Sequence, residues 1–265
     1  MTIRDDHALA ADLATEAGER LLRVREHLGY DDPGALRAEG DRSSHLYLME
    51  SLARLRPSDS VLSEEATREE RLDPRRLGAE RVWIVDPLDG TREFSERREG
   101  AEAGAADEGR ADWAVHVALW ERGRLSAGAV ALPSQGRTLT TADPPKLPAY
   151  DKGRFRIAVS RTRPPEFVRK LAYLVGADLV PIGSAGAKIS AVLTGEVEAY
   201  VHAGGQNEWD SAAPVAVALA AGAHASRIDG SELTYNQADP SLPDILVSLP
   251  ELATSLLAGI RDLHR

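Results

Sequence analysis

The sequence has 265 residues, of which 43% are hydrophobic and 28% charged, as in an ordinary soluble globular protein of one large or two modest domains. Its net charge of −10 argues against a general nucleic-acid-binding surface, which would need a basic face. The absence of cysteine excludes disulfides and cysteine-ligated zinc sites, and it fits a cytosolic location. We find neither an apolar signal core nor a run of membrane-spanning length, and expect neither export nor a membrane partner.

The first half of the chain predicts two helices followed by short strands. Apolar residues recur at helical spacing over residues 9–28 and again over 41–55, with a loop over 29–40 between them. The charged stretch 66–81 predicts a loop or a short helix. Short apolar runs indicate strands at residues 61–63, 82–85, 113–120 and 127–132. The last two strands flank a turn and predict a hairpin.

Two stretches without apolar periodicity interrupt the pattern. Residues 96–111 predict an exposed, mobile insertion, either a surface loop or a lid. The proline-rich stretch 142–153 predicts a linker between an N-terminal lobe (1–145) and a C-terminal lobe (152–265) that form one compact unit with the site between them. Strands and helices then alternate, which indicates layered α/β packing. The strands are expected at 156–160, 199–202, 223–228 and 245–248, and the helices at 165–175, 184–193, 211–221 and 250–263.

The string Asp86-Pro87-Leu88-Asp89-Gly90-Thr91 directly follows a predicted buried strand. An isolated Asp-x-x-Asp-Gly is as consistent with a solvated turn, but the full string after a strand predicts a metal site. Mg²⁺ prefers oxygen ligands, which the two carboxylates and the Leu88 carbonyl can supply. Gly90 lets the backbone approach an anion closely, and Thr91 adds a hydroxyl. Metal-dependent phosphate chemistry is therefore the leading hypothesis.

Three further carboxylates are candidates for the same site. Glu64 ends another short strand, and strand ends are where sites collect in α/β sheets. Asp210 lies at the start of an apolar helix, and Asp41 opens the second predicted helix. Each of these two could instead be a helix N-cap, although a carboxylate at a helix start can cap the helix and still face a metal.

The segment Gly183-Ser184-Ala185-Gly186-Ala187-Lys188 is the best phosphate-binding candidate, because a glycine-flanked turn that opens a helix offers backbone N–H groups to an anion. It lacks P-loop spacing and is as consistent with a simple left-handed turn. Arg92, Arg161 and Arg163 are candidate anion contacts, and for each a solvated surface position is at least as consistent. His116, in an apolar strand, is taken as structural. No Gly-x-Ser-x-Gly string supports covalent serine catalysis.

These strings resemble the signatures of the inositol monophosphatase superfamily, over about residue 8 to the C-terminus. The matching strings are Asp86–Thr91, Glu64-Glu65 and Trp209-Asp210-Ser211-Ala212-Ala213-Pro214. The resemblance implies a layered α/β fold, the sugar-phosphatase-like αβαβα sandwich, and a lithium-sensitive, Mg²⁺-dependent phosphomonoesterase. The superfamily also suggests a homodimer.

Four strings are similar to the CysQ type within that superfamily, particularly to actinobacterial members. They are Leu62–Glu65, Thr91–Phe94, Gly183–Lys188 and Ala203–Asp210. The resemblance implies a 3'(2'),5'-bisphosphate nucleotidase of sulfur metabolism, which converts 3'-phosphoadenosine 5'-phosphate to AMP and phosphate. The sulfated precursor of that nucleotide, 3'-phosphoadenylyl sulfate, is a second candidate substrate.

The resemblance also implies two to three Mg²⁺ ions. Glu64, Asp86 and the Leu88 carbonyl would hold one ion, and Asp86, Asp89 and Asp210 a second. A third, weaker ion would lie near Glu64 and carry the attacking water.

The same resemblance gives roles in catalysis to Asp41, Thr91 and Glu64, with Asp41 and Thr91 orienting and deprotonating the water. Leu36–Asp41 departs from the Val-Thr-x-x-Asp string of many members, which bears on Asp41 alone. The expected substrate contacts are Glu64, Leu88, Asp89, Gly90, Thr91, Arg92, Gly183, Ser184, Ala185, Lys188 and Asp210.

Two alternatives stay open at this point. The same metal cage would serve inositol monophosphatase or fructose-1,6-bisphosphatase activity, so that only the outer pocket over residues 160–208 would decide the substrate. A protein of a different class, a non-catalytic binder of a phosphorylated metabolite, would not need every catalytic group, yet all the expected carboxylates and Thr91 are present.

Overall fold

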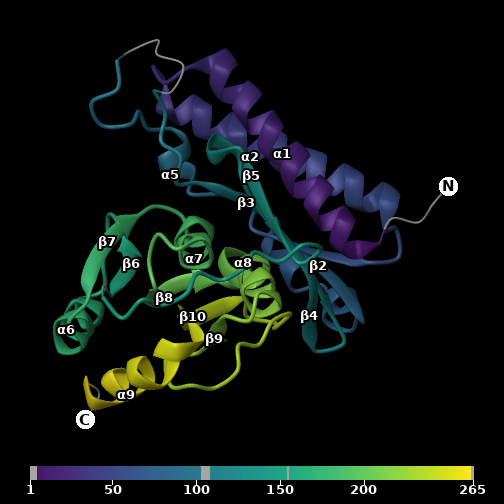
Figure 1. Cartoon of the computed structure of the whole chain (residues 1–265). Helices are drawn as coiled ribbons and strands as arrows, with labels where there is room; N and C mark the ends of the chain where they lie inside the picture. Colours follow the sequence, from purple (N-terminus) through teal and green to yellow (C-terminus); the bar gives the residue numbers. More distant parts are fainter. Residues whose placement is uncertain (1–4, 103–107, 154, 264–265) are drawn as a thin grey trace.

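The computed structural model describes residues 5–102, 108–153 and 155–263. Its helices and sheets stack in five layers, from the purple helices at one face to the yellow helix at the other (Figure 1). The three helical layers are α1 (Asp6–Leu28) with α2 (Pro33–Leu55), α7 (Ala185–Thr194) with α8 (Glu208–Ala220), and α6 (Glu166–Val175) with α9 (Ala253–Leu263). A five-stranded sheet lies between each pair of helical layers. The structure therefore confirms the expected αβαβα sandwich.

The first sheet has the strand order β1-β2-β3-β4-β5. Its strands are β1 (Ser60–Ser63), β2 (Arg81–Asp89), β3 (Ala114–Glu121), β4 (Arg124–Leu132) and β5 (Arg137–Thr140). The β1–β2 pair is parallel and the other pairs are antiparallel, so the predicted β3–β4 hairpin is confirmed. The sequence did not predict β5, because this half-buried edge strand carries a single strongly apolar residue, Leu139.

The second sheet has the order β7-β6-β8-β10-β9. Its strands are β6 (Arg156–Ser160), β7 (Asp178–Ile182), β8 (Ala199–Asn207), β9 (His224–Ser226) and β10 (Ser241–Ser248). Strand β6 runs parallel to β7 and β8, whereas β10 runs antiparallel to β8 and β9. Strand β7 was not predicted, because it contains a proline, which argues against a strand in the sequence. Within sheets, proline is largely confined to edge strands, and β7 lies at the edge of this sheet.

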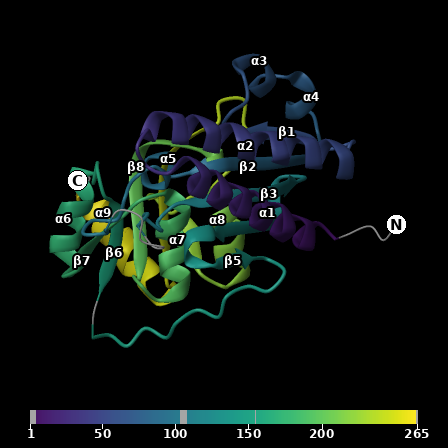
Figure 2. The ribbon, with the colours of Figure 1, turned by 90° about the horizontal axis from the view of Figure 1, so that it is seen from above.

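Short elements and one long connection complete the chain. Stretch 66–81 contains two four-residue helices, as one reading of the sequence expected. Residues 141–153 have no regular secondary structure and run along the outside of the stack (Figure 2). The short helices are α3 (Arg68–Arg71), α4 (Pro74–Leu77), α5 (Thr91–Phe94), η1 (Pro133–Gln135) and η2 (Pro250–Leu252). Within the described ranges, no helix has both the length and the apolar character needed to cross a membrane.

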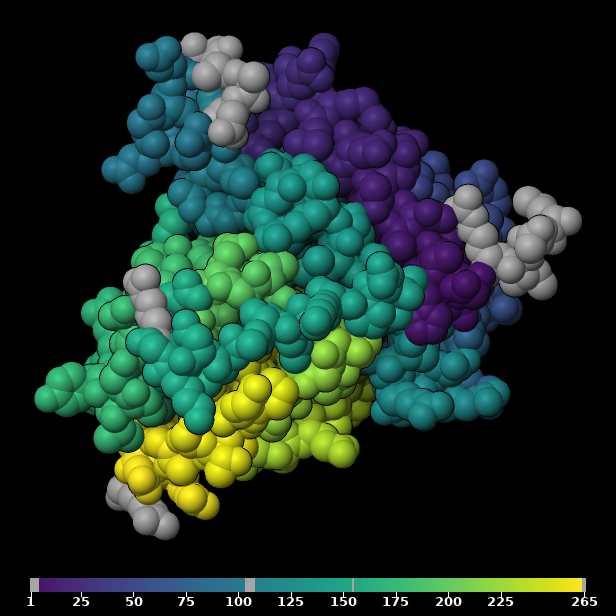
Figure 3. All heavy atoms as spheres, viewed as in Figure 1, coloured from purple at the N-terminus to yellow at the C-terminus, as the bar shows by residue number. Residues whose placement is uncertain are grey.

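Helix α8 ties the two halves together. It packs on β2, β3 and β4 of the first sheet and on strands of the second. A helix buried on all sides must be apolar all round, and most residues of α8 are buried, among them Val215, Val217 and Ala218. A second core lies between the first sheet and the helices α1 and α2, which form the opposite face of the molecule from α9 (Figure 3). Asp210 therefore lies on a largely buried helix.

Helix α2 begins eight residues earlier than the sequence predicted. Asp32 caps it by accepting hydrogen bonds from the N–H groups of Gly34 and Ala35, at 3.1 and 3.0 Å, and Pro33 occupies the first turn. The prediction of a loop over residues 29–40 is wrong beyond residue 32, because Asp-Pro-Gly is a helix start here and not a turn. Asp41 consequently lies inside the helix and is no N-cap.

The described ends of stretch 96–111 pair with each other. Arg97 forms an isolated antiparallel bridge with Gly109, and its guanidinium lies 3.0 Å from Asp31 at the base of α2. Residues 103–107 lie outside the described residues. The expected mobile insertion, and its use as a lid, therefore stay predictions.

Candidate metal centre and active site

Strand β2 does not end before the Asp86–Thr91 string but runs through Asp89, with an irregular register against β3 between Asp86 and Asp89. The expected tight turn is therefore a bulged strand end. Oxygens of Asp86, Asp89 and Asp210 all lie within 4.8 Å of one another. Asp86 and Asp89, from the first half of the chain, thus meet Asp210, which comes from the second half.

Hydrogen bonds within and around the string fix its backbone. The Leu88 N–H donates to Asp86 Oδ1 at 3.1 Å, and the hydroxyl of Ser44 on α2 donates to the Pro87 carbonyl at 2.7 Å. The Thr91 hydroxyl donates to the Leu88 carbonyl at 3.1 Å. Gly90 has a φ of 85°, a left-handed conformation that favours glycine, and α5 begins directly after it. The backbone of the string is therefore held by hydrogen bonds within the string and from α2.

Asp89 is anchored by the other half of the chain. Its Oδ2 accepts hydrogen bonds from the Ser184 hydroxyl and, at 2.7 Å, from the Gly186 N–H, both at the start of α7. Asp89 is 8% exposed. Two donors from α7 thus fix the position of Asp89 Oδ2.

Asp210 is the third residue of α8 and is not its N-cap. Asn207 caps the helix, and Asp210 Oδ2 accepts the Asn207 N–H at 2.6 Å in a reciprocal capping box. The side chain of Asp210 does accept a hydrogen bond from a backbone N–H at the helix start, but the N-cap residue is Asn207, three positions earlier. This bond orients the Asp210 side chain toward the helix start and hence toward Asp89.

Glu64 follows β1 directly, as expected, and lies beside Asp86. Burial raises the pKa of Glu64, and a hydrogen bond with Asp86 counteracts that shift. The Arg71 guanidinium donates to the Glu64 carbonyl and lies 4.6 Å from the ring centre of Trp209, next to Asp210. One arginine therefore links the segments that carry two of the expected ligands.

The cluster holds more negative charge than its surroundings balance. Burial, followed by the charges of Glu64, Asp89 and Asp210, raises the pKa of Asp86 well above its ordinary value. Burial and the charge of Asp89 raise the pKa of Asp210 to about 8, although Lys188 opposes the shift. Carboxylates that repel one another in a buried site are stabilised by a cation, and an all-oxygen donor set suits a hard divalent cation. The residues present fit such an ion.

These shifts predict how the stability of the metal-free protein depends on pH. Unfolded carboxyl groups have pKa values near about 4, whereas those of folded Asp41 and Asp210 are about 7 and about 8. Between these values the folded state holds more protons than the unfolded state, so its stability falls as pH rises and levels off above about pH 8. In EDTA, the unfolding midpoint measured by circular dichroism should fall from about pH 5 to about pH 8, and saturating Mg²⁺ should raise it more at the higher pH. An EDTA midpoint that rises over this range would contradict the account.

Asp41 and Thr91 lie beside the carboxylate cluster. Burial, followed by the charges of Glu65 and Glu64, raises the pKa of Asp41 to about 7, and a hydrogen bond with Thr91 opposes this shift. A group with a pKa near neutrality can accept a proton at working pH. The structure therefore brings together both residues that the sequence predicted as catalytic partners of Glu64.

The Gly183–Lys188 segment supports Asp89 more than it offers donors to an anion. The N–H groups of Gly183 and Gly186 donate to Asp112 and Asp89, at 2.6 and 2.7 Å. Ser184 caps α7 through the Ala187 N–H. Lys188 is 6% exposed, with its Nζ 3.3 Å from the Gly183 carbonyl. The prediction of a phosphate cradle is thus wrong for these three N–H groups, because carboxylates and a hydroxyl of the protein already occupy them.

Of the predicted arginine contacts, Arg161 binds protein carboxylates. Its guanidinium lies 2.8 Å from Glu93 and 2.6 Å from Glu96, so its charge is already balanced. Arg92 is exposed in the first turn of α5, beside the metal string, and Arg163 is exposed after β6. Arg92 is the better placed of these two for an incoming phosphate.

Sequence reasoning missed the residues that hold the site together. Ser44, Asp112 and Asn207 each form a hydrogen bond with a backbone group of a site segment. His116 was expected to be structural, yet it lies opposite Asp86 in the β2–β3 ladder and near Asp89. No single-sequence signal marks these residues, because their roles depend on strand register and on which loop packs against which.

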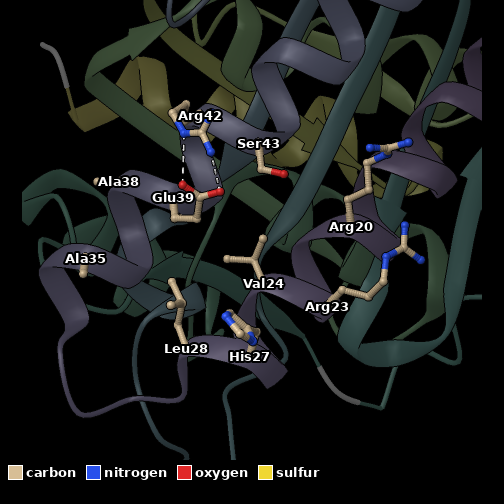
Figure 4. A pocket seen from close by; sticks show the side chains of 10 residues that line it. All are labelled: Arg20, Arg23, Val24, His27, Leu28, Ala35, Ala38, Glu39, Arg42 and Ser43. Carbon is tan, nitrogen blue, oxygen red and sulfur yellow. Dashed lines mark hydrogen bonds and ion pairs between the residues drawn. The ribbon is translucent and has the colours of Figure 1, made fainter.

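A groove between α1 and α2 is a separate feature of the outer helical layer (Figure 4). It has a volume of about 780 Å³, and Val24 and Leu28 contribute apolar surface to it. Glu39 and Arg42 on its wall form a two-pronged ion pair. Its lining includes none of the clustered carboxylates, so the groove is distinct from the metal centre.

The five-layer fold brings together buried carboxylates that could hold a cation, as metal-dependent phosphatases require. Comparison with known proteins agrees. The family model described as "Inositol monophosphatase family" matches residues 5–264. The chain belongs to the inositol monophosphatase family and is a phosphoric monoester hydrolase.

Two curated relatives and one solved structure illustrate the relationship. A protein of Mycobacterium leprae (strain TN) named 3'-phosphoadenosine 5'-phosphate phosphatase is 50% identical, covering 97% of this chain and 94% of the relative. The 3'(2'),5'-bisphosphate nucleotidase CysQ of Escherichia coli (strain K12) is 32% identical, covering 89% of this chain and 97% of the relative. The crystal structure of CysQ from Bacteroides thetaiotaomicron superposes with a TM-score of 0.71 at 26% identity, covering 91% and 96% of the two chains.

Proposed function

We propose that this protein is a Mg²⁺-dependent phosphatase that hydrolyses 3'-phosphoadenosine 5'-phosphate to AMP and phosphate. A second substrate, 3'-phosphoadenylyl sulfate, would give adenylyl sulfate. The observation that carries the proposal is the 50% identity, over almost the whole chain, to a relative named for this activity. The convergence of Asp86, Asp89 and Asp210 supports the metal requirement.

The proposal assigns the cluster to two or three Mg²⁺ ions. Glu64, Asp86 and the Leu88 carbonyl would hold one, and Asp86, Asp89 and Asp210 another. Asp86 would be shared between the two ions, and the charges of Glu64, Asp89 and Asp210 all act on it. Bound Mg²⁺ lowers the pKa of water and stabilises negative charge on a phosphoryl group.

Asp41 and Thr91 carry the proton chemistry in this proposal. They would orient a water for attack on phosphorus, and Asp41 would accept a proton from that water as the new P–O bond forms. The bond to the 3' oxygen breaks, and this oxygen takes up a proton from solvent and leaves as the 3'-hydroxyl of AMP. The Thr91 hydroxyl lies 3.1 Å from the Leu88 carbonyl and within hydrogen-bonding reach of Asp41, and its single proton can be donated to either oxygen. No covalent phosphoenzyme is required.

Substrate contacts are proposed from the same neighbourhood. Gly90, Thr91 and Arg92 would contact the scissile phosphate, and the buried charge of Lys188 would attract the rest of the nucleotide. Ser184 and Ala185, at the start of α7, would line the path between them. Glu64, Leu88, Asp89, Gly183 and Asp210 complete the proposed contact set.

A substrate panel tests the assignment. Phosphate release should be measured at equal concentrations of 3'-phosphoadenosine 5'-phosphate, 3'-phosphoadenylyl sulfate, AMP, inositol 1-phosphate and fructose 1,6-bisphosphate, each with Mg²⁺ and with EDTA. Specificity is measured as a ratio of kcat/KM values. We expect the bisphosphorylated nucleotides to have the highest kcat/KM, by about 100-fold or more over the other substrates. EDTA should abolish the signal.

The outcomes separate the alternatives. A preference for inositol 1-phosphate or fructose 1,6-bisphosphate would keep the metal mechanism and refute the nucleotide assignment. If no substrate gives phosphate release, the non-catalytic binder is favoured.

Three further features of the protein are proposed from the sequence. The chain would act in the cytoplasm, form a homodimer, and divide into lobes 1–145 and 152–265 with the site between them. Ultracentrifugation of the purified protein tests the homodimer. Titration of LiCl at fixed Mg²⁺ tests the expected lithium sensitivity.

A further inference from the structure

His116 is a fully buried residue with both ring nitrogens directed at segments of the metal centre. Its Nδ1 lies 2.9 Å from the Trp209 carbonyl oxygen, and its Nε2 lies 3.3 Å from Asp89 Oδ2. A carbonyl oxygen only accepts hydrogen bonds, so Nδ1 carries a proton and donates it. One side chain on β3 therefore contacts the strand end that carries Asp89 and the residue that precedes Asp210.

Packing around this imidazole is very close. A Cβ atom at Gly186 would lie 2.0 Å from His116 Nε2, so only glycine leaves room for the ring. The N–H of the same glycine donates to Asp89 Oδ2 at 2.7 Å. Asp89 Oδ2 is thus enclosed by donors of α7 on one side and by the imidazole on the other.

A purely space-filling role does not account for this arrangement. His116 Nε2 is buried and makes no hydrogen bond within the described ranges, which is unfavourable for a core position that an apolar side chain could fill. The Nε2 atom lies 3.3 Å from an oxygen of Asp89, in the cluster that could hold a cation.

We propose that His116 is a positioning residue of the metal centre, which holds Asp89 and Asp210 at the separation needed to share one divalent cation. The Nδ1–H hydrogen bond fixes the start of α8, and the ring, packed 3.3 Å from Asp89 Oδ2, keeps that oxygen turned toward Ser184 and Gly186. The inference rests on the proposed function only in requiring that this pair binds a cation.

Two variants separate the contacts of the ring. The amide of His116→Asn reaches the position of Nδ1 and can still donate to the Trp209 carbonyl, but this variant loses the contact with Asp89. The amide of His116→Gln reaches toward the position of Nε2, and this variant loses the hydrogen bond to the Trp209 carbonyl. His224→Asn is the matched control, because His224 lies on β9 and contacts Ser226 at 2.9 Å, outside the site.

The experiment is Mn²⁺ binding to the metal-free full chain, followed by electron paramagnetic resonance without substrate. Loss of a residue that orients a metal ligand lowers metal affinity by about 10- to 100-fold, and we expect that loss in both His116 variants. His224→Asn should bind Mn²⁺ like the native chain. The rise in unfolding midpoint on adding Mn²⁺, relative to EDTA for the same variant, should shrink in parallel, which a general loss of stability would not cause.

Each outcome has a meaning. If both His116 variants bind Mn²⁺ within about twofold of the native chain, while Asp86→Asn does not bind, the positioning role is wrong and the metal centre stands. If the native chain binds no Mn²⁺, the proposed function fails first. If neither His116 variant folds, Gly186→Ala decides, because its Cβ must displace the imidazole: native-like Mn²⁺ affinity overturns the inference, and a 10-fold or greater loss supports it.

Discussion

Replacing Asp86 by Asn should reduce kcat by about 1,000-fold or more, because the shared carboxylate is expected to bind both principal cations and several kcal/mol of transition-state stabilisation would be lost with them. The substitution is nearly isosteric, and Asn can still accept the Leu88 N–H bond through its side-chain oxygen. Phosphate release at saturating Mg²⁺ measures the effect.

Stability distinguishes this loss from misfolding. Asp86 is buried among like charges, so its neutral replacement relieves repulsion in the metal-free state. We expect the unfolding midpoint of Asp86→Asn in EDTA to equal or exceed that of the native chain at pH 8. Asp143→Asn, in an exposed loop, should leave both activity and stability unchanged. Substantial turnover by Asp86→Asn would refute the metal assignment.

Replacing Asp41 by Asn should reduce kcat by about 100- to 10,000-fold while leaving Mn²⁺ affinity close to native, since a positioned general base contributes an effect of that size. Asn keeps a hydrogen-bonding partner for Thr91 but cannot accept the proton of the attacking water. The measurement is kcat together with direct Mn²⁺ binding.

A residue on the outer side of α2 provides the control. Glu39 precedes Asp41 by two positions, yet it lies in the outer groove and pairs with Arg42. Glu39→Gln should therefore retain native kcat and Mn²⁺ affinity. If Asp41→Asn loses affinity as much as kcat, then Asp41 acts on the cations and the assignment as base is wrong.

Strand-end carboxylates were predictable because their signal is local. Glu64 and Asp86 each directly follow a short apolar run, which can be recognised without knowing the fold. The bulged continuation of β2 to Asp89 was not predictable, because it depends on pairing with β3 and on Ser44 holding the Pro87 carbonyl.

Helix starts were predicted less well than helices. Asp32-Pro33-Gly34 and Asp41 both carry features of a start, and only the hydrogen bonds from Gly34 and Ala35 decide in favour of Asp32. The same applies to Gly183–Lys188, where the glycine pattern is typical of an anion-binding turn. In the folded chain, the N–H groups of this segment donate to Asp112 and Asp89 instead.

The anchoring of Asp89 by Ser184 and Gly186 has a consequence for how the protein is made. These partners are 95 and 97 residues apart in the sequence. Strand β8, which leads into the helix of Asp210, pairs with β10, which begins at Ser241. The cation site therefore depends on contacts between distant parts of the chain and cannot be complete before Asp210 has been synthesised, so non-local contacts must form before the site exists.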